Sequence, residues 1–175
     1  KNPRVEIMVP LVGNIEEFLN QKKIIVNTYE RLSKKHKQKL VYKIGTMIEV
    51  PRACFSAKAI AKHADFFSFG TNDLTQTTFG FSRDDVGSFF PGYFEKEILS
   101  FDPFESIDEK SVGALMETAV KKGKAGNPVL SLGVCGEHGG DPKSITFCNK
   151  IGLHYVSCSP FRVPVARLAA AQAVL

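Results

Sequence analysis

Two carboxylates stand where buried strands of this sequence are expected to end. Glu49 follows an apolar run that ends at Ile48, and Asp73 follows the next such run along the chain. Such a carboxylate costs free energy unless it is paired, hydrogen-bonded or bound to a metal, and neighbouring strands about 4.8 Å apart would let both reach one ion. With no His or Cys beside them, Glu49 and Asp73 are predicted to bind the hard cation Mg²⁺, with Mn²⁺ as a second option. The plainer alternative is that each carboxylate caps the helix that follows it.

A flexible polar turn lies next to Asp73. Gly70, Thr71 and Asn72 end the preceding apolar run. Backbone N–H groups at the start of a helix or turn can hold an anion, so these residues are candidates for binding a small acidic ligand beside the ion. An ordinary Asn-containing turn explains the same pattern and stays open as an alternative.

A single thiol follows a third apolar run in a segment rich in glycine. Cys135 lies within residues 133–140, where glycine lets the backbone and a small ligand approach closely. A thiol in such a place could move a proton or act as a nucleophile, and a buried, inert cysteine is the alternative. Glu137 and His138 could tune this thiol or only hold the loop.

The elements that must position these residues form five units, each an apolar run followed by a helix-like segment. The predicted strands are residues 5–11, 44–50, 65–69, 129–135 and 155–158. Asn14 and Glu17 form a capping box before the first helix, and Pro51 opens the second, which is expected to run to about residue 63. A helix is expected to open at residues 106–109 and end near residue 123, and two more are predicted at 142–152 and from 164 onward. The stretch between Asn72 and residue 105 contains several Pro and Gly residues and is predicted to be mostly loop.

Repeated strand-then-helix units predict an α/β fold with a parallel sheet. In such folds the active site lies at the carboxyl ends of the strands, which is where the candidate residues stand. Five units in 175 residues come close to the roughly 31 residues per unit of an eight-unit barrel. Five units cannot close that barrel, so the sequence allows either an open doubly wound sheet or part of a barrel.

Composition excludes several classes of function. The formal net charge of +5 comes largely from two lysine clusters, which lack interleaved aromatics and any nucleic-acid-binding motif and are expected to be solvated helix faces. No apolar stretch is long enough to cross a membrane, and no phosphate-binding glycine motif for ATP is present. The four cysteines have no disulfide or zinc spacing, which suits a reducing compartment.

The three strand-end segments resemble those of the phosphoenolpyruvate (PEP)-utilising enzymes. The matching segments are residues 45–53, 67–76 and 133–142, and the likeness extends over essentially the whole chain. Residues 77–85 and the loop 136–142 resemble the dikinases of this family more than its synthases. The resemblance implies a (β/α)8 TIM-type barrel of which this chain holds strands four to eight, so that residues 1–175 are the C-terminal portion of the PEP- and pyruvate-binding barrel domain.

The resemblance also assigns roles to individual residues. Glu49 and Asp73 match the Mg²⁺ ligands, and Cys135 matches the residue that delivers a proton to the enolate carbon, with Ser68 expected near its thiol. The positions implied to contact pyruvate or PEP are Glu49, Gly70, Thr71, Asn72 and Asp73. Arg52, Arg83 and Arg162 match none of the arginines that clamp the phosphoryl group in the family.

The implied reaction interconverts ATP, phosphate and pyruvate with AMP, diphosphate and PEP. The phosphohistidine and nucleotide-binding domains that this reaction needs are absent from residues 1–175, so the piece alone is not expected to complete it. The family implies a homodimer joined through the barrel domain and a cytoplasmic location, with plastid and glycosome as other options. A fragment of a PEP synthase and a non-catalytic dimerisation piece stay open as alternatives.

Overall fold

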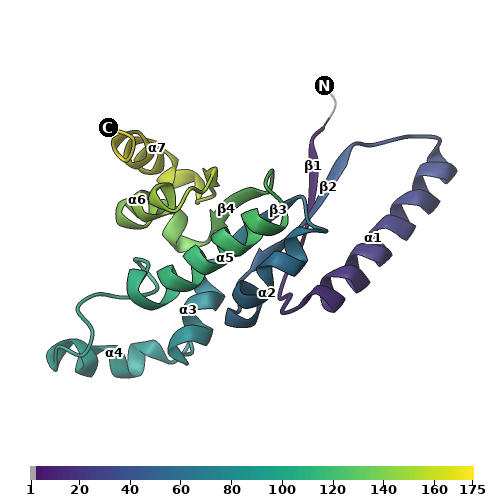
Figure 1. The fold of residues 1–175 in the computed structure, drawn as a ribbon. Coiled ribbons are helices and arrows are strands. Elements are labelled where there is room, and N and C mark those ends of the chain that lie inside the picture. Colours follow the sequence, from purple (N-terminus) through teal and green to yellow (C-terminus); the bar gives the residue numbers. More distant parts are fainter. Residues whose placement is uncertain (1–2) are drawn as a thin grey trace.

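The computed structural model describes residues 3–175, which form one parallel sheet with helices packed against it (Figure 1). The five strands lie in the order β1-β2-β3-β4-β5, and every neighbouring pair is parallel. Their bounds are β1 Val5–Val9, β2 Tyr42–Ile48, β3 Phe66–Gly70, β4 Ser131–Cys135 and β5 Tyr155–Val156. The predicted α/β fold with a parallel sheet is therefore confirmed.

Seven α-helices connect or extend these strands. Their bounds are α1 Ile15–His36, α2 Pro51–Ala61, α3 Thr71–Phe79, α4 Val86–Glu95, α5 Ala114–Gly126, α6 Pro142–Lys150 and α7 Val163–Gln172. The predicted capping box of α1 is present: the Asn14 side chain accepts from the Glu17 N–H at 3.0 Å, and the Glu17 carboxylate accepts from the Asn14 N–H at 3.1 Å. Asp141 caps α6 in a similar way by accepting from the N–H of Ser144.

The apolar core lies between the helices and one face of the sheet. Phe67 and Phe69 of β3 are fully buried, and they stand level with Leu132 and Val134 of β4. Helices α1, α2, α5 and α6 contribute buried side chains to the same cluster, and α2 and α5 lie side by side against the sheet (Figure 1). On the opposite face, β3 carries Ser68 and Gly70, and β4 carries Gly133 and Cys135, next to the larger side chains of Phe66 and Met47.

The strand order bears on the two architectures that the sequence left open. A doubly wound sheet reverses its strand order at a switch point, with helices on both faces. Here the order follows the chain without reversal, and the core helices share one face. The sheet of the described residues is therefore singly wound, and its closure into a barrel stays a prediction.

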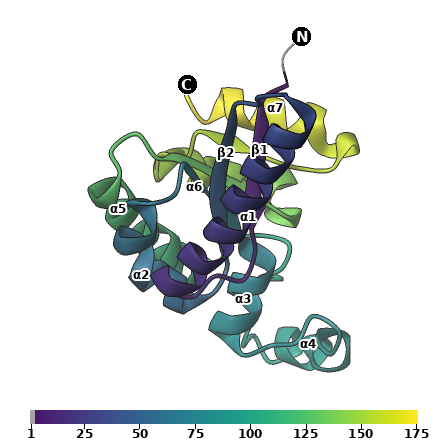
Figure 2. The same ribbon diagram turned by 90° about the vertical axis from the view of Figure 1, so that its right-hand side faces the viewer.

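The prediction that residues 73–105 are mostly loop was wrong. Helix α3 begins directly after β3, and α4 follows it and stands away from the sheet (Figure 2). Thr, Gly and Phe are weak helix formers, so these segments carry little helical periodicity. Packing among aromatic rings stabilises them instead: Phe81 lies 5.1 Å from Phe89 and 6.0 Å from Tyr93, between ring centroids.

Element ends differ slightly from the prediction. The strands shift by at most two residues; β1, for example, ends at Val9 because Pro10 has no N–H to continue the ladder. The helix expected from residue 106 begins instead as a π-turn at Glu109–Gly113 and becomes α-helical at Ala114. Within residues 3–175, no helix combines the length and apolarity needed to cross a membrane.

Candidate functional site

The register of the sheet brings three predicted site residues to one level. Ile48 pairs with Phe69, so Glu49 lies level with Gly70, and Gly70 pairs in turn with Cys135. Residues at the same level of neighbouring parallel strands point to the same face. Glu49, Gly70 and Cys135 therefore form a row across the carboxyl ends of β2, β3 and β4, on the face that the core helices leave free.

Glu49 is held in a fixed orientation at one end of this row. Its side chain is only 2% exposed, and Oε1 accepts from the backbone N–H of Leu11 at 2.6 Å. The other oxygen faces Gly70, since a Cβ built there would lie 2.4 Å from Oε2. Burial raises the pKa of Glu49 and the charge of Asp73 raises it further, against the lowering effect of the Leu11 hydrogen bond.

The electrostatics at Glu49 and Asp73 fit a hard cation. Asp73 lies in the first turn of α3 and accepts a hydrogen bond from Gln76 at 3.2 Å. Among residues 3–175 the salt bridges involve other carboxylates, so this neighbouring pair has no basic side chain to balance it. The described residues contain no cluster of three or more Asp, Glu, His or Cys side chains that could hold a metal. A cation here would take its remaining ligands from substrate or water oxygens, as Mg²⁺ commonly does.

The start of α3 supplies polar groups beside the carboxylates. Thr71 is fully buried, and its hydroxyl lies 3.3 Å from the Cys135 carbonyl oxygen and 2.7 Å from Nδ1 of His138. The Asn72 side chain rests against Gly136, and its Oδ1 is buried without a hydrogen-bond partner in the structure. A buried polar atom without a partner is costly, so this position suits a small polar ligand.

Cys135 presents a protonated thiol at the other end of the row. Burial raises the pKa of Cys135, a hydrogen bond with Ser68 lowers it, and the charges of Glu49 and Asp73 raise it again. Since an ordinary thiol already titrates above neutral pH, the raised pKa keeps Cys135 protonated. Of the two roles that the sequence allowed, a proton donor fits this environment better than a thiolate nucleophile.

Tyr155 lies beside the candidate site, and the sequence pattern does not single it out from the rest of the last strand. It pairs with Gly133, which pairs with Ser68, so the three share the layer directly beneath Cys135. The tyrosine ring fills the space above Gly133, where a Cβ would lie 2.1 Å from it. Burial raises the pKa of Tyr155, and a hydrogen bond with Ser68 opposes this. The available signal for this packing was Gly133 in one predicted strand and the aromatic Tyr155 in the next.

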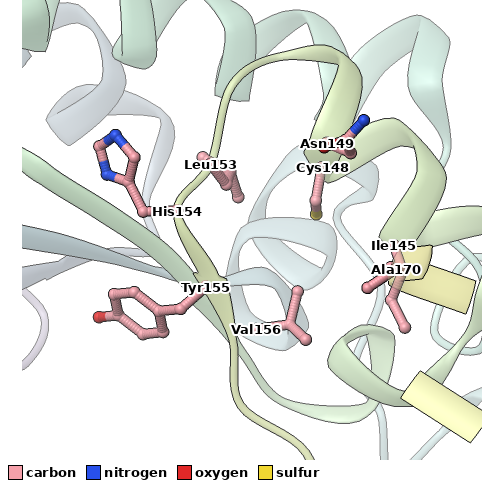
Figure 3. Close-up of a pocket in the computed structure, with 8 residues that line it drawn as sticks. All are labelled: Ile145, Cys148, Asn149, Leu153, His154, Tyr155, Val156 and Ala170. Carbon is pink, nitrogen blue, oxygen red and sulfur yellow. The ribbon is translucent and has the colours of Figure 1, made fainter. Parts of the chain in front are cut away.

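A pocket behind β5 carries no chemistry comparable to that of the candidate site. Tyr155 and Val156 point to opposite sides of the strand, and Val156 faces this pocket between β5, α6 and α7 (Figure 3). Burial raises the pKa of the pocket's Cys148 to about 12, so that thiol is inert. The ring of His154 already accepts a hydrogen bond from the Leu132 N–H through Nδ1.

Comparison with known proteins gives a consistent result. Residues 1–175 match the family described as PEP-utilising enzyme, PEP-binding domain. The chain is 58% identical over 170 residues to a pyruvate, phosphate dikinase of Clostridium symbiosum and 58% identical over 169 residues to a chloroplastic one of Mesembryanthemum crystallinum. A pyruvate, phosphate dikinase of Rickettsia bellii is 52% identical over 170 residues.

These alignments cover 97% of this chain in each case, but only 20%, 18% and 19% of the three relatives in the same order. The chain therefore spans about a fifth of the length of the relatives it matches.

Proposed function

Because this chain belongs to the PEP-utilising enzymes through their PEP-binding domain, we propose that it forms the pyruvate and PEP site of a pyruvate phosphate dikinase. The whole reaction interconverts ATP, phosphate and pyruvate with AMP, diphosphate and PEP. The observation that carries the proposal is the row of Glu49, Gly70 and Cys135 across three neighbouring strand ends, with Asp73 beside it. Glu49 and the protonated thiol of Cys135 lie on either side of Gly70, whose missing side chain lets the Glu49 carboxylate lie close against the backbone.

The site residues divide into groups that bind the ligand and a group that moves a proton. Glu49 and Asp73 would hold Mg²⁺, which would supply positive charge to stabilise the enolate of pyruvate. The first turn of α3, with Thr71 and Asn72, binds the ligand's carboxylate through its backbone N–H groups and the side-chain NH2 group of Asn72. Gly70 lets the Glu49 carboxylate lie directly against the backbone between Glu49 and Cys135, and its own backbone contacts the ligand there.

Cys135 is the acid in the direction that forms pyruvate. Once the phosphoryl group has left PEP, the S–H bond breaks and the proton forms a new C–H bond at C3 of the enolate. The enolate's electron pair makes that bond, while the oxygen at C2 becomes a carbonyl. In the reverse direction the thiolate removes a proton from the methyl group of pyruvate. Ser68 lies beneath the sulfur, and its hydrogen bond stabilises the charged form of Cys135, while Tyr155 hydrogen-bonds to Ser68 in the same layer.

The rest of the machinery comes from outside these residues. We place the five strands as the last five of a (β/α)8 barrel, since the singly wound sheet with its helices on one face supports that closure. The site-bearing face then lines the barrel interior. A phosphohistidine domain delivers the phosphoryl group, a nucleotide-binding domain charges the histidine, and two copies associate through the barrel domain.

The metal site is tested by binding of Mg²⁺–oxalate, an enolate mimic, measured by calorimetry on the full-length protein. Glu49→Gln combined with Asp73→Asn should weaken binding by at least about 100-fold, because the cation loses both charged ligands. Unchanged binding in this variant would show that the two carboxylates are not the metal site.

The proton role is tested by exchange of pyruvate methyl protons with deuterated water, followed by NMR. Cys135→Ala should reduce the exchange rate by at least about 100-fold while Mg²⁺–oxalate binding persists. Exchange at the wild-type rate in this variant would show that Cys135 does not transfer the proton. A phosphate-dependence assay separates the dikinase from a PEP synthase, because only the dikinase consumes phosphate and forms diphosphate.

A further inference from the structure

His138 is a buried titratable group that the reaction above does not use. It is fully buried within the short 3-10 helix Glu137–Gly140, immediately after β4. No hydrogen bond joins its ring to the Cys135 thiol. The ring instead joins two segments distant in sequence: Nδ1 lies 2.7 Å from the Thr71 hydroxyl, and Nε2 lies 3.0 Å from the Pro103 carbonyl oxygen.

The chemistry of these contacts fixes the tautomer. A carbonyl oxygen only accepts, so Nε2 carries a proton and donates it to Pro103. Burial lowers the pKa of His138, although the charges of Asp141, Asp102 and Glu137 oppose this, so the ring is neutral at neutral pH. Nδ1 is then unprotonated and accepts from the hydroxyl of Thr71.

This arrangement orients the Thr71 hydroxyl. A hydroxyl has one proton, and two acceptors compete for it: Nδ1 of His138 at 2.7 Å and the Cys135 carbonyl at 3.3 Å. The shorter contact takes the proton, so the oxygen lone pairs of Thr71 turn away from the imidazole. The same loop supports the neighbouring residue, because Gly136 lies against the side chain of Asn72.

We propose that His138 is a positioning residue, which fixes the ligand-binding first turn of α3 through its hydrogen bond to Thr71. This inference rests on the proposed function, since it concerns the same pyruvate site. The other contact, from Nε2 of His138 to the Pro103 carbonyl, holds the imidazole ring in place and does not involve the ligand. Pro103 precedes Phe104, which stacks on Phe90 of α4 with ring centroids 6.3 Å apart, so the ring bears against a packed segment.

The two contacts of the ring can be separated by substitution. Asparagine carries its amide on Cγ, at the depth of Nδ1, so His138→Asn can keep the bond to Thr71 and loses the one to Pro103. Glutamine carries its amide on Cδ, at the depth of Nε2, so His138→Gln can keep the bond to Pro103 and loses the one to Thr71. Both variants replace a buried ring with a neutral amide, which makes them matched.

The measurement is the Kd for Mg²⁺–oxalate on the full-length protein, together with the melting temperature. We expect His138→Gln to raise the Kd about tenfold, as for one lost buried hydrogen bond, and His138→Asn to bind nearly as the wild type does. Equal Kd values for the two variants, whether both normal or both weakened, would overturn the proposal. Loss in step with the melting temperature would also overturn it, since it would indicate a purely structural role.

Thr71→Val provides a second route that leaves His138 in place. Valine matches threonine in shape and lacks the hydroxyl, so His138→Gln should have no further effect on the Kd in a Thr71→Val background. A full tenfold effect of His138→Gln in that background would contradict the proposal. If the wild-type protein itself failed to bind Mg²⁺–oxalate, the proposed function would fail first, and the two failures are thereby distinguished.

Discussion

The two faces of the central sheet differ sharply in what they contribute. On β3, Phe67 and Phe69 point into the helix-covered core and are fully buried, while Ser68 and Gly70 point to the opposite face. One strand of five residues thus presents one set of side chains to the core and the other set to the candidate site. The difference teaches that each face can be altered separately, because consecutive residues belong to different faces.

The site face carries an electrostatic cost that the core face does not. Glu49 is nearly as buried as Phe67, and burial raises its pKa because the charged form is poorly solvated. The core face gains free energy from each buried ring, whereas the site face holds an unneutralised carboxylate. Substitutions on the core face should therefore lower stability, whereas substitutions on the site face should mainly change ligand binding and titration.

The largest expected effect comes from the core face. Phe67→Ala should lower the free energy of unfolding by about 3–5 kcal/mol, because it leaves a cavity beneath α5, where the ring lies 3.1 Å from the Cβ position of Gly123. Chemical denaturation measures this directly. A loss under about 1 kcal/mol would contradict the division between faces.

The next effect comes from adding a side chain at Gly70 on the site face, where it would displace the Glu49 carboxylate. Gly70→Ala should weaken Mg²⁺–oxalate binding by at least about 100-fold, since its Cβ would lie 2.4 Å from Oε2 of Glu49 and 2.7 Å from Cε of Met47. Gly87→Ala is the matched control, because a Cβ on Gly87 in α4 meets nothing within 4 Å. The control should bind normally and gain about 0.5–1 kcal/mol of stability.

A smaller effect is expected one residue from Phe67 on the other face. Ser68→Ala removes a hydrogen bond that lowers the pKa of Cys135, so the midpoint for alkylation of this thiol should move to higher pH. Stability should change by less than about 1 kcal/mol. Mass spectrometry in a Cys158→Ser background follows the rate at Cys135, since Cys54 and Cys148 are buried with pKa values of about 12. An unchanged alkylation midpoint would show that Ser68 does not lower the pKa of the Cys135 thiol.

The smallest effect concerns the pH dependence of stability without metal. The folded protein has a raised pKa at Glu49, so it binds a proton more tightly than the unfolded chain, and stability falls as pH rises through that pKa. Glu49→Gln cannot ionise and should melt at a higher temperature than wild type at neutral pH. This advantage should shrink as pH falls toward the ordinary carboxyl pKa of about 4.5. A constant difference across pH would mean that Glu49 carries no burial cost.

Much of the site could be predicted from local pattern. Glu49, Asp73 and Cys135 each follow an apolar strand, and parallel strands bring their carboxyl ends to one edge of the sheet whatever the details of packing. Periodicity failed for α3 and α4, where aromatic contacts between side chains such as Phe81 and Phe89 stabilise helices that propensity does not favour. Tyr155 was missed because its partner Gly133 lies 22 positions away in sequence.

The sequence by itself determined the alternation of strands and helices, the types of residue at the strand ends, and the family to which those ends belong. These depend on interactions among near neighbours, which leave a readable pattern. Only the tertiary structure decided that Glu49, Gly70 and Cys135 lie side by side on neighbouring strands. It also decided the hydrogen bond between His138 and Thr71. Those depend on how segments some 20 to 67 residues apart dock, and hydrogen bonds at such separation leave no periodic signal in the chain.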